Sequence, residues 1–213
     1  MPSVSRGEVD EDVSCSYGPG RNGGRCMLKA IIVTAILSLM PAPSPKWGET
    51  NEEYRARVDM IGERVDAAVQ YAKPSARKAL ALAGVVIFHG ESRFSPFVHS
   101  GERRGDGGHA ICMGGNHQLS MSTEDWEGLA GATPEATERC ARVTAERVVR
   151  AYWYCKGLDP KMGYPEAFTL YGTGRTCRSK ETRWSGIFEG RGKRWEALFA
   201  RKYPMAISLG GAG

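Results

Sequence analysis

The residues whose side chains could do chemistry are concentrated between positions 89 and 117. This segment holds all four histidines of the chain, His89, His99, His109 and His117, together with Glu91, Asp106 and Cys112. Such groups are the usual zinc ligands. The run from His89 to Glu91 matches the H-x-E half of the zinc deaminase signature, but no P-C-x-x-C half follows. We therefore expect solvated or hydrogen-bonded histidines, with no metal and no other cofactor.

Glu91 is the strongest candidate for a catalytic group. It falls at the C-terminal end of the most apolar helix that the sequence predicts, where the helix dipole disfavours a negative charge. Three phenylalanines lie close to it in the chain and could exclude water: Phe88, Phe94 and Phe97. Both effects raise the pKa of a carboxyl group, as a general acid near neutral pH requires. The alternative is a glutamate that ends its helix in contact with solvent.

The sequence around Glu91 resembles a known signature. Residues 91–96 read E-S-R-F-S-P and are followed by Ser100 and Gly101, which is similar to the E-S-x-F-x-P…S-G pattern of lytic transglycosylases and goose-type lysozymes. The family's glycine-containing block ending in Gln and an aliphatic residue corresponds to residues 107–119, although M-G-G-N-H-Q replaces G-A-x-G-L-M/W-Q. Its Y-x-x-G block corresponds to residues 167–174, with G-T-G after the tyrosine. The resemblance covers about residues 80–177.

This resemblance implies a lytic transglycosylase that cleaves the MurNAc-GlcNAc β-1,4 bond of peptidoglycan. Glu91 would be the single general acid/base, first protonating the glycosidic oxygen and then taking a proton from the C6 hydroxyl of the sugar. The product would carry a 1,6-anhydro muramyl end. Ser92, Gln118 and Tyr171 are the implied substrate-binding residues, and peptidoglycan glycan strands are the implied partner.

Two other functions fit the same residues. A hydrolytic, goose-type lysozyme would more often use a second acid, for which Asp106 and Glu102 are the candidates. A catalytically silent wall-binding module, such as a phage virion protein, could keep the fold without turnover. Nucleic-acid binding is not expected, because the 29 Lys and Arg are interleaved with 24 Asp and Glu and the net charge is only +5.

The elements that must position these residues are predicted to be mostly helices. At 213 residues the chain is long enough for one well-buried domain. Caps, prolines and apolar spacing predict five helices, over residues 50–73, 76–90, 134–155, 165–171 and 193–203. Residues 93–121 are rich in Gly, Ser and His and suit loops or short strands. The expected fold class is mostly α (α+β, lysozyme-like), with a small irregular glycine-rich lobe.

The N-terminal part differs in composition from the rest. We expect residues 1–26 to be a disordered tail, 27–45 a signal-like or hydrophobic segment with a proline linker, 46–205 the lysozyme-like domain and 206–213 a flexible tail. The apolar run from Ala30 to Met40 follows Lys29 and is typical of a signal peptide, with Met27 as an alternative start. As a helix it rises only about 16 Å, roughly half a bilayer core. The alternative is a short buried or membrane-lying helix.

Export would place the protein in the periplasm, the cell envelope or the medium, with a phage virion as another location and at most transient membrane contact.

In an exported protein, four of the cysteines could form disulfides. Cys140 and Cys155 lie on one predicted helix about 22 Å apart and cannot pair. Each would have to reach Cys112 or Cys177. Of the two pairings we expect Cys112–Cys140 with Cys155–Cys177, which closes the shorter loops, and the alternative is four free thiols in a cytosolic protein.

Overall fold

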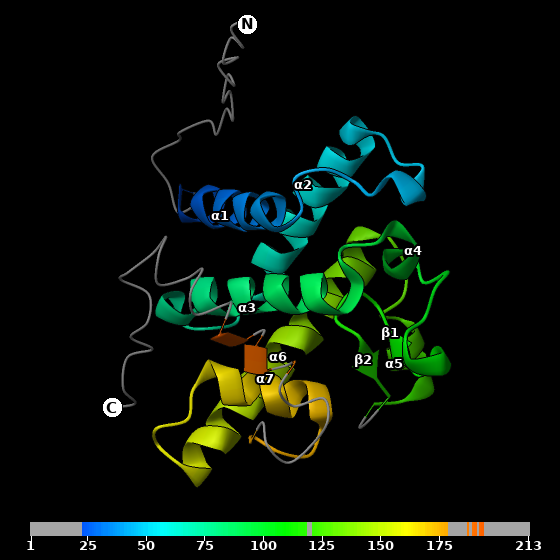
Figure 1. Cartoon of the computed structure of the whole chain (residues 1–213). Coiled ribbons are helices and arrows are strands. Elements are labelled where there is room, and N and C mark those ends of the chain that lie inside the picture. Colours follow the sequence, from blue (N-terminus) through cyan, green and yellow to red (C-terminus); the bar gives the residue numbers. More distant parts are fainter. Residues whose placement is uncertain (1–22, 119–120, 179–186, 188, 191, 194–213) are drawn as a thin grey trace, which may run out of the picture.

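Helices make up most of the fold (Figure 1). The computed structural model describes residues 23–118 and 121–178, together with 187, 189–190 and 192–193. This part of the chain contains seven α-helices: α1 (Gly23–Leu39), α2 (Asn51–Ala68), α3 (Pro74–Ser92), α4 (Pro96–His99), α5 (Thr123–Glu127), α6 (Pro134–Leu158) and α7 (Tyr164–Thr173). Two 3-10 turns, η1 (Pro45–Trp47) and η2 (Asp106–Gly108), and two strands, β1 (Ala110–Ile111) and β2 (Asn116–His117), complete it. The predicted mostly helical class with a small irregular lobe is confirmed.

Local capping explains where α2 and α6 begin. Thr50 and Glu53 form a capping box at the start of α2, in which the Thr50 hydroxyl accepts from the Glu53 N–H and the Glu53 carboxylate accepts from the Thr50 N–H. At the start of α6 the Thr133 hydroxyl accepts from the Ala136 N–H, without a reciprocal carboxylate bond. The predicted ends are less accurate. Helix α2 ends at Ala68, before the expected stop at Lys73, and α6 continues through the exposed Gly157.

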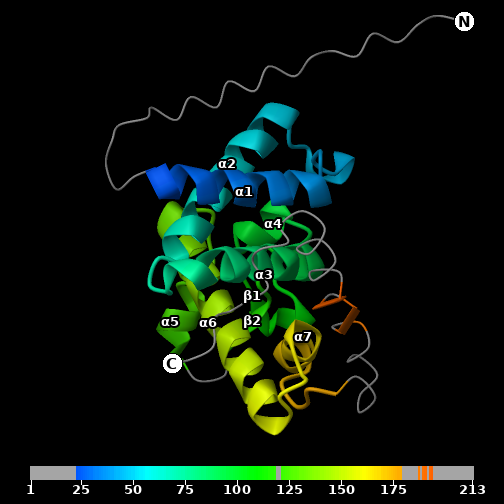
Figure 2. The ribbon, with the colours of Figure 1, turned by 90° about the vertical axis from the view of Figure 1, so that its left-hand side faces the viewer.

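Helix α3 runs through the middle of the molecule. Figures 1 and 2 show α1 on one side of it and α7 on the other, and α6 packs against α2 as well as against α3 and α7. Its residues from Ala79 to Phe88 are all buried. Leu80, Val85 and Phe88 belong to one hydrophobic cluster with residues of α1, α2, α6 and the glycine-rich lobe, whereas Leu82 and Ile87 belong to a second cluster with residues of α6 and α7. A helix that is apolar on nearly every side belongs at the centre of a core, as the sequence predicts.

Helix α1 packs against α2 and α3. Its residues Ile32 and Ile36 are fully buried in the hydrophobic cluster that α2 and α3 share. The two helices approach so closely that a Cβ added to Gly62 of α2 would lie 2.5 Å from a methyl carbon of Val33. The signal-like segment is therefore packed into the core of the domain that follows it, the buried-helix arrangement that its sequence also allowed. Among the described helices, none is long and apolar enough to cross a membrane.

The glycine-rich lobe lies beside the C-terminal end of α3 (Figure 1). It contains α4, η2, the antiparallel pair β1–β2 and α5, with Ile111 opposite Asn116 in the sheet. Disulfide Cys112–Cys140 joins the lobe to α6, and Cys155–Cys177 joins the end of α6 to the segment after α7. This is the pairing that the sequence predicts. Residues 1–22 of the expected N-terminal tail, the tail 206–213 and all but the first residue of the helix expected over 193–203 lie outside the described residues, whereas residues 23–26, expected in the disordered tail, form the start of α1.

Candidate active site

Glu91 lies in the last turn of α3, with its side chain exposed. The carboxylate rests against Gly115, in the turn between β1 and β2. A Cβ added to Gly115 would lie 3.1 Å from Oε2 of Glu91 and 3.2 Å from its Cγ. Gly115 also has a φ of 60°, which favours glycine. The end of α3 and the β1–β2 turn therefore meet at the Glu91 carboxylate.

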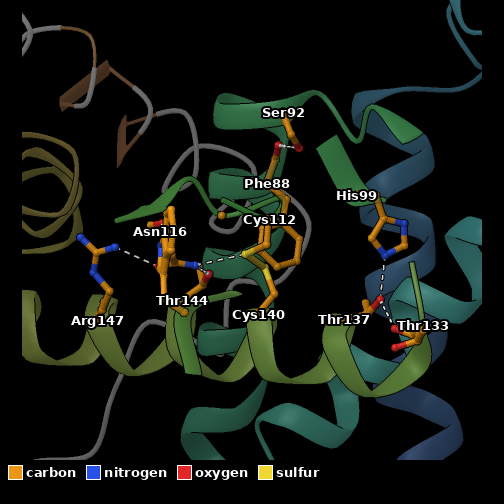
Figure 3. Close-up of a disulfide and its surroundings, with 12 residues drawn as sticks. Phe88, Ser92, His99, Cys112, Asn116, Thr133, Thr137, Cys140, Thr144 and Arg147 are labelled. Carbon is orange, nitrogen blue, oxygen red and sulfur yellow. Dashed lines mark hydrogen bonds between the residues drawn. A yellow bond between two sulfur atoms is a disulfide. The ribbon is translucent and has the colours of Figure 1, made fainter. Parts of the chain in front are cut away.

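The chain turns sharply just after Glu91. Arg93 and Phe94 have φ angles of 51° and 57°, in the left-handed region that costs a residue with a side chain about 1–2 kcal/mol. The buried Ser92 hydroxyl donates to the Phe88 carbonyl at 2.7 Å (Figure 3). It also accepts from the Phe94 N–H at 3.1 Å. Ser92, which the resemblance implies as a substrate contact, is thus engaged with the backbone and shapes this turn.

Tyr171 of α7 reaches the same β1–β2 turn. Its side chain is 8% exposed, and its hydroxyl donates to the Gly114 carbonyl at 2.8 Å and lies 3.3 Å from Oδ1 of Asn116. Burial raises the pKa of Tyr171 to about 12, an effect that the positive charge of Arg147 opposes and the negative charge of Glu91 reinforces. The phenol therefore stays protonated at neutral pH and keeps its hydrogen-bond donor.

Asn116 is a residue of the site that the sequence analysis did not identify. It is fully buried, and its Oδ1 accepts from Nη1 of Arg147 at 2.9 Å (Figure 3). Its Nδ2 donates to Oγ1 of Thr144 at 3.0 Å, and its carbonyl accepts from the Trp126 indole N–H at 2.9 Å. The Arg147 guanidinium also lies 4.6 Å from the centre of the Tyr171 ring. Asn116 thus links β2 to α5, α6 and α7.

Gln118, the predicted substrate-binding residue of this block, directly follows β2. It is exposed, and its Nε2 donates to Oγ1 of Thr123 at the start of α5. The side-chain amide that approaches Tyr171 belongs to Asn116, two residues earlier in the same block.

The two candidates for a second acid lie in the glycine-rich lobe. Glu102 is exposed and accepts from the Ser100 hydroxyl, and Asp106 begins η2, although its side chain is not described.

His99 is buried and has a defined tautomer. Its Nε2 lies 2.7 Å from Oγ1 of Thr137, whose hydroxyl proton is donated to the Thr133 carbonyl (Figure 3). Nε2 must therefore carry the ring hydrogen. The buried Nδ1 is then unprotonated, and it has no hydrogen-bond partner in the structure. Burial, assisted by the positive charge of Arg57, lowers the pKa of His99 to about 4. His99 is thus neutral at pH 7.

The other residues considered as zinc ligands do not form a metal site in the part of the chain that the structure describes. Among the described residues, no three His, Cys, Asp or Glu side chains come together as metal ligands. Cys112 is bonded to Cys140 and so is not a thiolate. His109, in contrast to His99, is exposed.

The structure therefore brings Glu91, Gly115 and Tyr171 to one place, with Asn116 and Arg147 behind them. These residues come from four segments: the end of α3, the β1–β2 turn with β2, α6 and α7. Comparison of the chain with known proteins finds no matching family model, no matching curated protein and no matching solved structure.

Proposed function

We propose that the protein is a peptidoglycan lytic transglycosylase with Glu91 as its general acid/base. The contact of the Glu91 carboxylate with Gly115, in a turn that the Tyr171 hydroxyl holds, is the observation that carries the proposal. The three sequence blocks of the resemblance meet at this point, although they are separated by long stretches of chain. An exposed carboxylate on a rigid helix end is also suited to reach a glycosidic oxygen.

The reaction needs one carboxyl group and returns it to its starting state. Protonated Glu91 gives its proton to the glycosidic oxygen, and the bond from that oxygen to C1 of MurNAc breaks with its electron pair going to the leaving sugar. The N-acetyl group of the substrate stabilises the cationic C1. The Glu91 carboxylate then takes the proton of the C6 hydroxyl as O6 bonds to C1. No water is consumed, and the product has a 1,6-anhydro end.

The disulfides favour a place of action outside the reducing cytosol. Both bridges, Cys112–Cys140 and Cys155–Cys177, are formed in the structure, and such bonds persist in oxidising compartments. Peptidoglycan lies in such a compartment in most bacteria. We therefore propose the cell envelope or the extracellular side as the place of action, with a phage virion as the alternative carrier.

Replacement of Glu91 by Gln tests the proposed role directly. The amide keeps the shape of the side chain but cannot cycle a proton, so we expect turnover of purified peptidoglycan to fall by at least about 10²- to 10⁴-fold. The circular dichroism spectrum and denaturation midpoint should not change, because Glu91 is exposed. Glu135→Gln, at an exposed glutamate in the first turn of α6, is the control and should keep wild-type turnover. Retention of a tenth of the activity by Glu91→Gln would remove Glu91 from the mechanism.

Mass spectrometry of the products separates the proposal from its alternatives. A transglycosylase leaves anhydro ends, whereas a hydrolase leaves reducing ends that are heavier by one water. We expect anhydro products, formed equally with and without EDTA. Reducing ends would assign the protein to the lysozymes, and the absence of products would leave a wall-binding module. Loss of cleavage in EDTA and its recovery with zinc would contradict the mechanism.

A further inference from the structure

Arg57 of α2 reaches from the N-terminal helices to the turn that follows Glu91. Its Nη1 donates to the carbonyl oxygen of Phe94 at 2.7 Å, across 37 positions of the sequence. Its Nε and Nη2 donate to the two carboxylate oxygens of Glu49, each at 2.7 Å. The guanidinium therefore bridges Glu49 and Phe94 with three hydrogen bonds in fixed directions.

This bridge is shielded from water. The Arg57 and Glu49 side chains are only 11% and 10% exposed. The Arg57 guanidinium carbon lies 5.5 Å from the centre of the Tyr54 ring and 5.9 Å from that of Trp47. A two-pronged arginine–carboxylate contact between aromatic rings holds the arginine in one orientation, and lysine cannot reproduce it.

The carbonyl that Arg57 binds belongs to the second of the two left-handed residues. Phe94 is fully buried, with its ring 6.5 Å from that of Phe88 in an edge-to-face contact. Ser92 holds the Phe94 N–H from within α3, and Arg57 holds the Phe94 carbonyl from α2. Both sides of Phe94 are thus fixed. Strained backbone of this kind persists only where its surroundings determine it.

We propose that Arg57, oriented by Glu49, is a positioning residue for Glu91. By holding the Phe94 carbonyl it keeps the left-handed turn closed, which fixes the last turn of α3 and the direction of the Glu91 carboxylate over Gly115. The inference rests on the proposed function for its effect on turnover. It also makes α2, which lies outside the stretch that resembles the transglycosylases, part of the catalytic apparatus.

Kinetics on soluble glycan strands measure this role. Arg57→Met removes all three hydrogen bonds, and we expect kcat to fall about 10- to 100-fold while KM stays within about twofold, because misplacement of a catalytic group by about 1 Å has this effect. Arg57→Lys and Glu49→Gln should lower kcat less. Arg142→Met breaks the exposed pair with Glu138 on the surface of α6, which does not touch the turn, and should leave kcat unchanged. Equal kcat in Arg57→Met, Arg57→Lys and wild type would overturn the proposal.

Relief of the strain distinguishes positioning from general structural support. The Arg93 side chain is exposed, and its backbone lies in the left-handed region. Arg93→Gly therefore removes both the positive charge and the backbone strain, whereas Arg93→Ala removes the charge alone. In the Arg57→Met background we expect Arg93→Gly to restore kcat at least about threefold relative to Arg93→Ala. The same kcat for the two double variants would contradict a role of Arg57 in holding this turn.

Amide exchange tests the positioning without any turnover. The Phe94 N–H, bonded to Ser92, should exchange slowly in the wild type and at least about tenfold faster in Arg57→Met, while the amides in the middle of α6 stay protected in both. If the wild type is inactive but shows this exchange pattern, the proposed function is refuted, whereas the proposal that Arg57 holds the turn at Phe94 is supported. If the Phe94 N–H exchanges at the same rate in Arg57→Met and in the wild type, Arg57 does not hold this turn, even if the enzyme is active.

Discussion

Gly115 is the residue whose missing side chain makes room for the Glu91 carboxylate. We expect Gly115→Ala to push Glu91 aside, because the new Cβ would lie 3.1–3.4 Å from three of its atoms, and to lower kcat about tenfold or more. Gly107→Ala is the matched control. Gly107 has a φ of 66°, close to that of Gly115, but no atom within 4 Å of an added Cβ.

The comparison of these two variants separates the effect of backbone strain from the effect of the contact with Glu91. Both should lose about 1–2 kcal/mol of stability in urea denaturation, since each forces alanine into the left-handed region. Only Gly115→Ala should lose turnover. A Gly115→Ala variant as active as Gly107→Ala would show that the position of Glu91 over Gly115 does not matter for catalysis.

His99 makes the stability of the protein depend on pH. Its pKa is about 4 in the folded state and near 6.5 when unfolded, so the unfolded chain binds more protons between these values. Stability should therefore fall as the pH is lowered from 6.5 to 4, by about 3 kcal/mol from this group, and the effect should vanish above pH 6.5. Urea denaturation at pH 7 and pH 4.5 measures it.

The variant that checks this assignment is His99→Gln, whose amide does not titrate and can still donate to Thr137. Its stability should change less between the two pH values than that of the wild type. His109→Gln, at an exposed histidine, should keep the wild-type pH dependence. If His99→Gln and His109→Gln show the same dependence, His99 is not the group responsible.

At the residue scale, the sequence points to candidate residues where the signal is local. Glu91 stands out because a carboxylate at the end of an apolar helix is unusual, and Tyr171 follows a recognisable pattern. Asn116 could not be distinguished from Gln118, because the choice depends on where a two-residue strand ends. Arg57 could not be identified either, since the carbonyl it binds lies 37 positions away.

At the scale of elements, the crossing of α1 and α2 depends on Gly62. A Cβ there would lie 2.5 Å from Cγ2 of Val33, closer than side chains tolerate. We expect Gly62→Ala to destabilise the protein by about 1–3 kcal/mol in urea denaturation, despite the better helix propensity of alanine. Val33→Ala in the same chain removes the obstructing methyl group and should recover part of the loss.

Gly84→Ala provides the control for helix propensity. Gly84 lies inside α3, and a Cβ added to it meets no atom within 4 Å. This variant should be neutral or stabilised by up to about 1 kcal/mol. If Gly62→Ala behaves like Gly84→Ala, α1 does not pack closely on α2 in solution, and the case for a signal-like segment outside the core is strengthened.

The elements themselves were predictable where their signals are local. The caps at Thr50 and Thr133 and the apolar residues of α3 are local features, and they located three long helices, although their ends differ by two to five residues. The position of α1 was not predictable in this way. An apolar run of about this length suits a signal peptide, a membrane surface or a core, and only the partner surface on α2 and α3 decides among them.

At the scale of the whole molecule, α6 acts as the support to which the less regular segments are fastened. Cys140 and Cys155 lie too far apart on this one helix to pair, which excludes one disulfide pattern and leaves two, and the shorter loops favoured the pattern that is observed. Asn116, in β2, is likewise held by Thr144 and Arg147 of α6. The arrangement of these segments around α6 could not be derived, because it depends on contacts between distant parts of the chain.

The two disulfides should therefore contribute alike to stability but differently to activity. They join residues 28 and 22 positions apart, so replacing either pair by alanines should cost about 3 kcal/mol in urea denaturation. Cys112 lies just before Gly114 and Gly115, whereas Cys177 follows α7. At a temperature where both variants are folded, we expect Cys112→Ala with Cys140→Ala to lower kcat at least about fivefold more than Cys155→Ala with Cys177→Ala, because only the first releases the turn under Glu91. Equal activity of the two variants would mean that α7 and Asn116 hold that turn without the disulfide.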